Sequence, residues 1–437
     1  MNRLLAAAIV IDLLVAHTAA AQVREGPSEP LQLATLQREA LSSDPRTREF
    51  ALQTEQTGLR VRNLEVERLP AVSALGQSQV QSDVPHPPSL IPGAPPLFLP
   101  PKDTYDVSAR VDQKLFDPSF RPRLALARAD LAESQARLRV AMYTLRDEVN
   151  EAFFTAALLQ EQIGALTTTL TDLETRLRET NVWVREGSAL PSDAAAIEAT
   201  LLQQRQQEDE LRATRGAAIA RLARLSGRTI AADATLAVPA LADLVAEARR
   251  GLEAVRARPE YEQFDRARDR SARQQELSVA SERPQLTAFG RAGLGKPGLN
   301  FINDRVASYA LAGVQLQWKA WTWGSAARER EALRIQQDVI AAEEAAFTSR
   351  VHRAVEFDLA AIDRLQSALA TDDRIVALRE AVDRTARARF REGAATASES
   401  LDRTTEWLGA RFAQARRRVE LAQAQARLLT TLGLEVR

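Results

Sequence analysis

The sequence contains no cysteine, which excludes disulfide bridges, thiol nucleophiles and zinc–thiolate sites together. It also excludes the lipid-bearing cysteine that some exported envelope proteins carry at their mature N-terminus. Histidine is almost as scarce, because only His86 and His352 follow the N-terminal apolar segment, and they lie far apart in the chain. The sequence has no nucleophile motif and no clustered metal ligands. It therefore gives no support for an enzyme, and we expect no cofactor.

Aromatic residues are also few, at 5% of the chain. Neither sign of charge is in excess, because 58 Lys and Arg residues balance 58 Asp and Glu residues. A net charge of zero argues against a nucleic-acid partner, which requires a basic surface. Abundant Leu and Ala with few aromatics favour long helices over a large β-sandwich core. Lysine is rare among the basic residues, and all four lysines fall in or beside the strands predicted below: Lys102, Lys114, Lys296 and Lys319.

Long apolar runs are missing beyond the N-terminus. The run from Leu4 to Ala16 is short, is interrupted by Asp12 and precedes the small residues Ala19-Ala20-Ala21. This pattern predicts a secretory signal peptide over residues 1–21. The alternative is an N-terminal membrane anchor, for which the run is too short. No other segment approaches the ~20 apolar residues of a transmembrane helix.

The sequence repeats itself. Pro45 and Phe50 recur as Pro259 and Phe264, 214 residues later, and Gly76 recurs as Gly290 at the same offset. Further on the offset falls to 206, where an identical Arg-Glu-Gly triplet at 185–187 recurs at 391–393. These matches occur in the same order in both halves, and one connecting segment differs in length between them. The sequence therefore predicts two structural repeats. We place them at residues 22–240 and 241–437 and expect both to form one domain.

Each repeat is predicted to run helix, strand, loop, strand, long helix, turn, helix. The long helices contain no internal proline, and leucines recur at three- and four-residue spacing, as at 166, 170, 173 and 177. About 65 helical residues span nearly 100 Å, so these helices need neighbours along their length, as coiled coils do. The predicted first helices cover about 33–67 and 241–282, the long helices 122–186 and 325–392, the turns 187–192 and 393–397, and the return helices 193–224 and 398–432.

Four strands are predicted at about 70–80, 104–116, 284–295 and 307–319. The clearest places Tyr105, Val107 and Val111 on one face and charged residues such as Asp106 on the other. Such alternation, over close to the ~9–11 residues of a tilted membrane span, favours a lipid-facing strand with a wet inner side. The alternative is a half-buried sheet in a soluble protein. Aromatic residues at both strand ends suit two interfacial girdles, namely Tyr105 and Tyr309 at one end and Trp318, Trp321 and Trp323 at the other.

Four strands cannot close a barrel, and an open sheet edge cannot face lipid. Several chains must therefore each contribute four strands. Three chains give a 12-stranded β-barrel, an even number within the known range. The predicted fold class is thus mainly α with membrane β: long antiparallel coiled-coil helices in an α-barrel, plus four strands per chain in a trimeric barrel.

In its order of elements, this sequence resembles the TolC-like outer membrane efflux protein family over essentially the whole mature chain. The resemblance also rests on the opening Leu31-Gln32-Leu33 through Glu39-Ala40-Leu41 to Asp44-Pro45, on Leu115-Phe116-Asp117-Pro118 before the long helix, and on the two glycine-centred turns. It implies a homotrimer whose β-barrel sits in outer-membrane lipid and whose α-barrel projects into the periplasm of a Gram-negative envelope.

The function implied by the resemblance is that of an exit duct in a tripartite efflux or type I secretion system. The implied partners are a periplasmic adaptor (membrane fusion) protein and an inner-membrane pump. The adaptor is expected to dock at the helical turns, at Arg185, Glu186, Gly187, Arg391, Glu392 and Gly393. The pump selects the cargo, so the sequence does not distinguish a drug, a metal ion or a polypeptide, or a proton-driven from an ATP-driven pump.

The resemblance also implies a periplasmic gate ringed by acidic residues. Glu399 and Asp402 lie six and nine residues after Gly393, as the family pattern requires, and Asp193 lies six after Gly187. Phe390 stands where the family often has a gating Tyr. Ala395 stands where a gating Arg can sit. The alternative for all three acids is a helix N-terminus, which favours negative charge.

Two other functions have weaker support from the sequence. A periplasmic adaptor would have one helical hairpin flanked by β-rich domains, whereas two hairpins and four membrane-length strands are predicted here. A coiled-coil scaffold of the cell envelope would need neither the strands nor the export signal.

Overall fold

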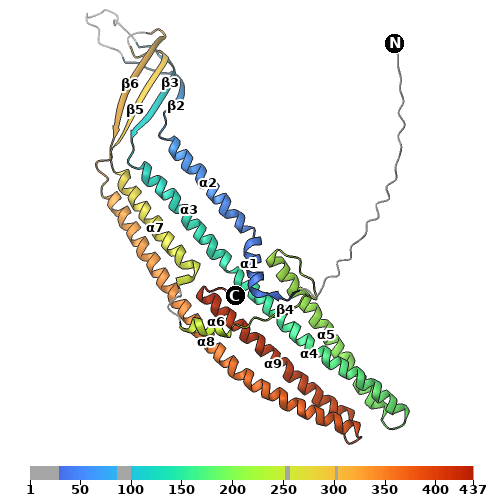
Figure 1. Ribbon diagram of the computed structural model, residues 1–437. Coiled ribbons are helices and arrows are strands. Elements are labelled where there is room, and N and C mark those ends of the chain that lie inside the picture. The colour runs from blue at the N-terminus through green and yellow to red at the C-terminus, as the bar shows by residue number, and fades with distance from the viewer. Residues whose placement is uncertain (1–28, 86–99, 251–255, 301–303, 437) are drawn as a thin grey trace, which may run out of the picture.

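The computed structural model describes residues 29–85, 100–250, 256–300 and 304–436. The predicted signal peptide and His86 lie outside the described residues. The chain is elongated, with four strands at one end, two helical hairpins at the other and several short elements between them (Figure 1). Within the described ranges no helix is long and apolar enough to span a membrane.

The predicted first helix is two helices, α1 (Leu33–Ser43) and α2 (Arg46–Val66). The break falls at Asp44-Pro45, where the residue before proline is disfavoured in the helical region. Asp44 accordingly has extended backbone angles, with φ −63° and ψ 128°. Its carboxylate accepts a hydrogen bond of 2.7 Å from the backbone N–H of Arg46, so the chain restarts as a helix directly after the proline.

In the second half, α6 (Ala242–Arg250) and α7 (Pro259–Ser281) stand where the sequence predicted one helix. Pro259 occupies the first turn of α7, where its missing N–H has no helical partner to lose. The outer ends of both first helices were therefore predicted to within one residue, but each was wrongly predicted as one continuous helix.

The long helices differ between the two halves. In the first half, α3 (Phe120–Tyr143) and α4 (Leu145–Arg185) meet at Thr144, which keeps helical angles. In the second half, α8 (Ser325–Arg391) is uninterrupted for 67 residues, or roughly 100 Å. The return helices are α5 (Pro191–Ser226) and α9 (Ala397–Leu432), so α4–α5 and α8–α9 form two antiparallel hairpins (Figure 1).

A hydrophobic core at mid-length ties both halves together. Here the short strands β1 (Leu31–Gln32) and β4 (Leu236–Ala237) pair in parallel. Phe153 and Phe154 of α4 are fully buried and pack edge-to-face, with ring centroids 5.4 Å apart. The core draws on α1, α4, α5, α6, α8 and α9. A buried chain of hydrogen bonds crosses it from Gln37 through Asn150 to Thr430.

A second, smaller core lies toward the hairpin ends. It contains Leu166, Leu170 and Leu173 of α4, with Leu401 and Leu408 of α9 facing them. The leucine stripe predicted from the sequence is thus buried between the two hairpins, not on a free surface.

The four long strands form one antiparallel sheet in the order β2 (Ala71–Val80), β3 (Asp103–Phe116), β5 (Gln285–Lys296), β6 (Ala307–Gln317). The two halves meet between β3 and β5, and β2 and β6 are the edges. The helices next to the sheet contact one another in the same sequence, α2 with α3, α3 with α7, and α7 with α8. The sheet and the helical layer therefore have their open edges on the same two sides.

Candidate functional site

The sheet has one uncharged face. Val107 lies opposite Leu294 in the register of β3 and β5, and Leu294 lies opposite Ser308 of β6. Side chains alternate between faces along a strand, so this register fixes both faces. Val107 is 67% exposed. The face it shares carries no charge through the middle of the sheet, over Val72, Ala74, Val80, Ala109, Val111, Ala288, Ala292, Ala310, Ala312, Val314 and Leu316.

The opposite face carries charges along its length, and they are paired, whereas the uncharged face has the Lys296–Asp103 pair at one strand end. Arg291 of β5 donates to Ser108 Oγ at 2.9 Å and to Asp106 Oδ1 at 2.8 Å. The Tyr309 hydroxyl of β6 donates to Asp106 Oδ2 at 2.5 Å. Gly293 permits this close approach, because a Cβ there would lie 2.6 Å from the Ser108 Cβ. The network therefore joins β3, β5 and β6 across the meeting of the two halves.

Tyr309 was predicted to belong to an aromatic girdle together with Tyr105, and the structure corrects this pairing. Tyr105 lies on the uncharged face and is exposed, whereas Tyr309 lies on the charged face with Asp106. Both tyrosines lie near the same end of the sheet, but the register places their side chains on opposite faces. At the other end of the sheet, Trp318, Trp321 and Trp323 are all exposed, and the last two pack edge-to-face.

The hairpin turns follow the predicted glycines. Gly187 and Gly393 have φ of 76° and 74°, the left-handed conformation that glycine adopts without strain. The backbone N–H of Ser188 donates to the Trp183 carbonyl and that of Ala394 to the Arg389 carbonyl, each at 2.8 Å. The charged residues predicted to dock an adaptor are exposed at these two turns: Arg185, Glu186, Arg391 and Glu392.

Of the three predicted gate acids, Asp193 and Glu399 lie in the first turns of α5 and α9 and Asp402 lies in the second turn of α9, and their contacts differ. Asp193 Oδ2 accepts from the backbone N–H of Leu190 at 3.2 Å, which is a helix-capping contact. In α9 the cap is supplied by Thr396, whose hydroxyl accepts from the Glu399 backbone N–H. The Glu399 carboxylate lies 3.5 Å from Arg389, and Asp402 is exposed. Capping therefore explains Asp193 but leaves Asp402 free for another role.

Phe390, the predicted gating aromatic, packs against Trp183 of the other hairpin with ring centroids 6.0 Å apart. The two rings bring the end of α8 against the end of α4. Trp183 was not singled out in the sequence, because nothing local to it distinguishes a ring that contacts the other hairpin.

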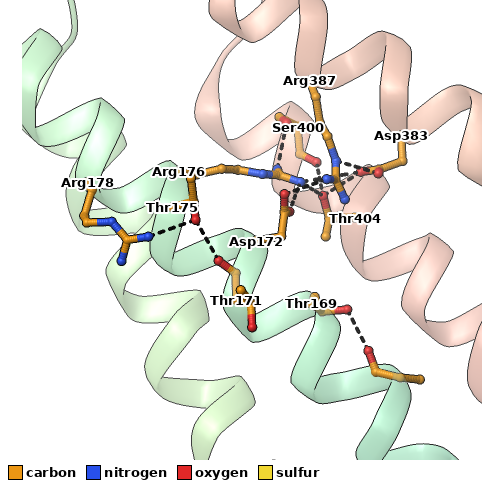
Figure 2. Close-up of polar contacts among 11 residues, drawn as sticks. Thr169, Thr171, Asp172, Thr175, Arg176, Arg178, Asp383, Arg387, Ser400 and Thr404 are labelled. Carbon is orange, nitrogen blue, oxygen red and sulfur yellow. Dashed lines mark hydrogen bonds and ion pairs between the residues drawn. The ribbon is translucent and has the colours of Figure 1, made fainter.

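Above this aromatic pair lies a group of charged and hydroxyl side chains, which we call the inter-hairpin cluster. Figure 2 shows its side chains converging from three helices. Its members are Asp172 and Arg176 of α4, Asp383 and Arg387 of α8, and Ser400 and Thr404 of α9.

The cluster joins the two hairpins by direct contacts. Asp172 Oδ2 accepts from Arg176 Nη2 at 2.6 Å and Asp172 Oδ1 from Arg387 Nη1 at 2.8 Å. Arg176 also donates to Thr404 Oγ1 at 3.2 Å, and the Thr404 hydroxyl donates to Asp383 Oδ1 at 2.7 Å. One carboxylate of the first hairpin thus binds a guanidinium of each hairpin.

Burial of the charged groups makes these contacts costly to break. The side chains of Arg176 and Asp383 are only 11% and 2% exposed. Burial lowers the pKa of Arg176, and the nearby positive charge of Arg387 lowers it further. A buried charge that loses its partner is costly, so neither hairpin can move away without breaking or rehydrating the cluster.

The sequence did not reveal this cluster. Asp172–Arg176 and Asp383–Arg387 are each four residues apart, a spacing that normally indicates an exposed ion pair on one helix. Only the packing of α4 against α8 and α9 brings the two pairs together. Among the described residues, the cluster included, no group of three or more His, Cys, Asp or Glu side chains could hold a metal ion.

The sequence was compared with protein-family models and with curated proteins. Residues 36–228 match the family model described as outer membrane efflux protein. No curated protein matches the sequence. The likeness in sequence to that family model therefore covers most of the first half of the chain.

Solved structures extend the likeness to almost the whole chain. The outer-membrane channel OprN superposes with a TM-score of 0.66 at 20% identity, covering 92% of this chain and 89% of that one. VceC from Vibrio cholerae gives 0.65 at 14%, with 93% and 97% covered. The open state of the MtrE channel of Neisseria gonorrhoeae gives 0.65 at 19%, with 93% and 89% covered. At these identities the likeness shows the fold.

Proposed function

We infer that this chain is a TolC-like outer membrane efflux protein, and that it forms the exit duct through which an inner-membrane pump discharges its cargo. The observation that carries this function is the sheet with one largely uncharged, exposed face and one charged face, set at the opposite end of the molecule from two long helical hairpins. The family match over residues 36–228 supports it.

The uncharged face is proposed to contact outer-membrane lipid. From Tyr105 to Leu115 the strand rises about 33 Å, and a tilt of ~40° reduces this to roughly 25 Å, the height of the apolar band on membrane barrels. The exposed tryptophans after β6 then lie at the interface nearer the periplasm, where their amphipathic rings are favoured.

We propose a homotrimer because the sheet has two unpaired edges among the described elements, β2 and β6. An open edge cannot remain in lipid without costly unsatisfied backbone groups. Pairing β6 of one copy with β2 of the next closes a ring, and three copies give twelve strands.

The helices offer a matching contact. On α2, the apolar side chains Leu52, Leu59 and Val66 are exposed and recur every seven residues, as in a coiled-coil seam. Thr57, on the opposite side of α2, is buried. On α8, at the other edge of the layer, a set of exposed apolar residues lies within about 60° of one another around the helix: Ile335, Val339, Phe357, Ile375, Leu378 and Val382. We propose that α2 of one copy packs against the sheet-proximal part of α8 of its neighbour.

The two halves of each chain are proposed to be structural repeats. Equivalent glycines support this: Gly227 and Gly433, 206 residues apart, both end a return helix in the left-handed conformation. Each half supplies two strands and one hairpin to the channel.

The narrow end of the resting pore is proposed to lie at the hairpin ends, ringed by Glu399 and Asp402. The adaptor is proposed to dock at the exposed turns around Gly187 and Gly393, and the inter-hairpin cluster to hold the two hairpins of each chain together until the adaptor and pump are engaged. We propose accordingly that the sheet lies in the outer membrane and the hairpins in the periplasm.

Native mass measurement in detergent and single-channel recording in planar bilayers test the proposal together. We expect a trimer that conducts ions. A stable detergent-solubilised monomer, or a trimer that forms no conducting pore, would show that the chain is not an exit duct.

A further inference from the structure

A cavity of about 160 Å³ lies between the two hairpins, beside the inter-hairpin cluster. It is lined from α4, α8 and α9, so it closes only when the hairpins are together. Its polar walls include three arginines, the Thr180 hydroxyl and the carboxylates of Asp172 and Glu179, and two aromatic rings give it apolar walls. The arginines are Arg176, Arg387 and Arg391, and the rings are Trp183 and Phe390.

Two buried hydrogen-bond donors on these walls have no partner among the described residues. Thr180 is 0% exposed, and its hydroxyl makes no hydrogen bond. This is unusual within α4, where Thr171 and Thr175 each donate to the carbonyl four residues earlier. Arg387 Nε lies 2.6 Å from Asp383 Oδ2 but is not directed at it, so this buried N–H also lacks a hydrogen bond. Buried donors of this kind require a partner.

The acceptors of the inter-hairpin cluster are already occupied, which leaves the Glu179 carboxylate as the other acid on the cavity wall. Both oxygens of Asp172 accept from guanidinium groups, and Asp383 accepts from Thr404. Arg391 is exposed at the turn and makes no hydrogen bond or ion pair with any residue that the structure describes. The lining therefore sets three arginines against two carboxylates and includes buried donors without a hydrogen bond, and burial already lowers the pKa of Arg176.

We propose that this cavity binds a small anion, either a halide or a small oxyanion such as a carboxylate. A guanidinium group can bind two oxygens of an oxyanion through two N–H groups. The Thr180 hydroxyl adds a second kind of donor. The volume suffices for an ion of this size with accompanying water, which takes ~30 Å³ per molecule in the liquid. The bound anion bridges α4 and α8 and so adds a link between the hairpins beside Asp172.

Iodide tests the proposal directly, because it is both a small anion and a collisional quencher of tryptophan, and Trp183 lines the cavity. Full-length protein in detergent is titrated with iodide at constant ionic strength, and the same titration of Trp183→Phe is subtracted. We expect a saturable quenching component that vanishes in Trp183→Phe and that acetate or nitrate displaces. Neutral acrylamide should give no saturable component. Iodide quenching that rises linearly, without displacement, overturns the proposal.

Three variants of the wall decide which ligand the cavity takes. Thr180→Val keeps the side-chain shape and removes only the hydroxyl, so iodide should bind about tenfold more weakly. Arg391→Gln should also weaken binding. Glu179 lines the same cavity, and Glu179→Gln should strengthen binding by removing a like charge. Glu174→Gln is the control and should leave iodide binding unchanged, because Glu174 pairs with Arg205 and neither residue lines the cavity.

The reverse pattern, with Glu179→Gln weakening and Arg391→Gln strengthening binding, would identify a cation site and overturn the proposal. Helix content by circular dichroism and native mass confirm that each variant folds and assembles. The binding measurement needs no conducting pore, so failure of this proposal is distinguishable from failure of the exit-duct function.

Discussion

Arg387 of the second hairpin donates to Asp172 of the first at 2.8 Å, and the other oxygen of that carboxylate is held by Arg176. One carboxylate therefore fixes the distance between two long hairpins. Asp172→Asn keeps the shape and removes the charge, leaving two buried guanidinium groups short of a partner. We expect the hairpins to separate more readily and mean conductance in planar bilayers to rise, with a loss of about 1–3 kcal/mol in stability.

The control for this change is Glu174→Gln, two residues along the same helix. Glu174 pairs with Arg205 at 2.7 Å within the first hairpin, and both side chains are well exposed. Exposed pairs contribute about 0–1 kcal/mol, so conductance should stay at its original value. Equal conductance in both variants would show that the inter-hairpin cluster does not restrain the pore.

The second prediction concerns lipid contact and uses adjacent residues of β6. Val314 lies on the uncharged face and Gln315 on the charged face, and both are exposed. Val314→Arg should impair assembly in the membrane by about 2–4 kcal/mol if the site is near the bilayer midplane, whereas Gln315→Arg should be tolerated. The yield of trimer from outer-membrane extracts measures both. Similar yields for the two variants would mean that the faces are assigned wrongly.

A third prediction concerns the seam between copies. Leu59→Glu places a charge in the exposed apolar stripe of α2 and should shift the native mass distribution from trimer toward monomer, because the charge would be desolvated against the neighbouring α8. Arg60→Glu lies about 100° further around the helix and serves as the control. If Leu59→Glu leaves the trimer intact, α2 does not form the contact.

The gate acids give a fourth prediction. Three copies of Glu399 and Asp402 would place six carboxylates around one axis, which should favour cations and allow block by trivalent cations. Replacing both with Ala should abolish cation preference and block in single-channel recordings. Because Arg389 lies 3.5 Å from Glu399, Arg389→Ala should strengthen cation preference. Unchanged selectivity in all variants would mean that these acids serve only the helix terminus.

The fifth prediction concerns pH. Burial raises the pKa of Asp358 above its ordinary value of 3.8, although Arg427 and Thr431 bind its carboxylate. A raised carboxyl pKa favours the protonated form in the fold, so its contribution to stability falls as pH rises from about 3.8 through the folded pKa and is constant above it. Asp358→Asn should therefore flatten the decline of Tm with rising pH. Asp363→Asn, which alters an exposed pair with Arg249, should keep the original profile.

Much of the fold could be read from the sequence because its periodicities are long and regular. The strands lie within two residues of the predicted ranges, and Gly187 and Gly393 mark the hairpin turns. Breaks within helices were harder to place. Proline at position 45 ends α1, but a first-turn proline is also compatible with a continuing amphipathic pattern, so the break was missed.

The site could be predicted less well, because its contacts join segments far apart in the chain. Alternation alone makes Ser108 an open, lumen-facing residue, whereas it is buried beneath Arg291 next to Gly293. Tyr309 was placed by its position at a strand end, and its face depends on the register with β5. Asp172 and Arg387 lie 215 residues apart, and no local pattern connects them.

The uninterrupted α8 has a mechanical consequence. It is anchored in the mid-length core as far as Leu365, and from there to its end at Arg391 the helix extends roughly 39 Å. A helix without a hinge behaves as a lever, so a tilt of about 10° at the core displaces its tip by roughly 7 Å. Small rearrangements at mid-length are thereby amplified at the far end of α8, and the contact between Arg387 and Asp172 must break wherever α4 does not follow.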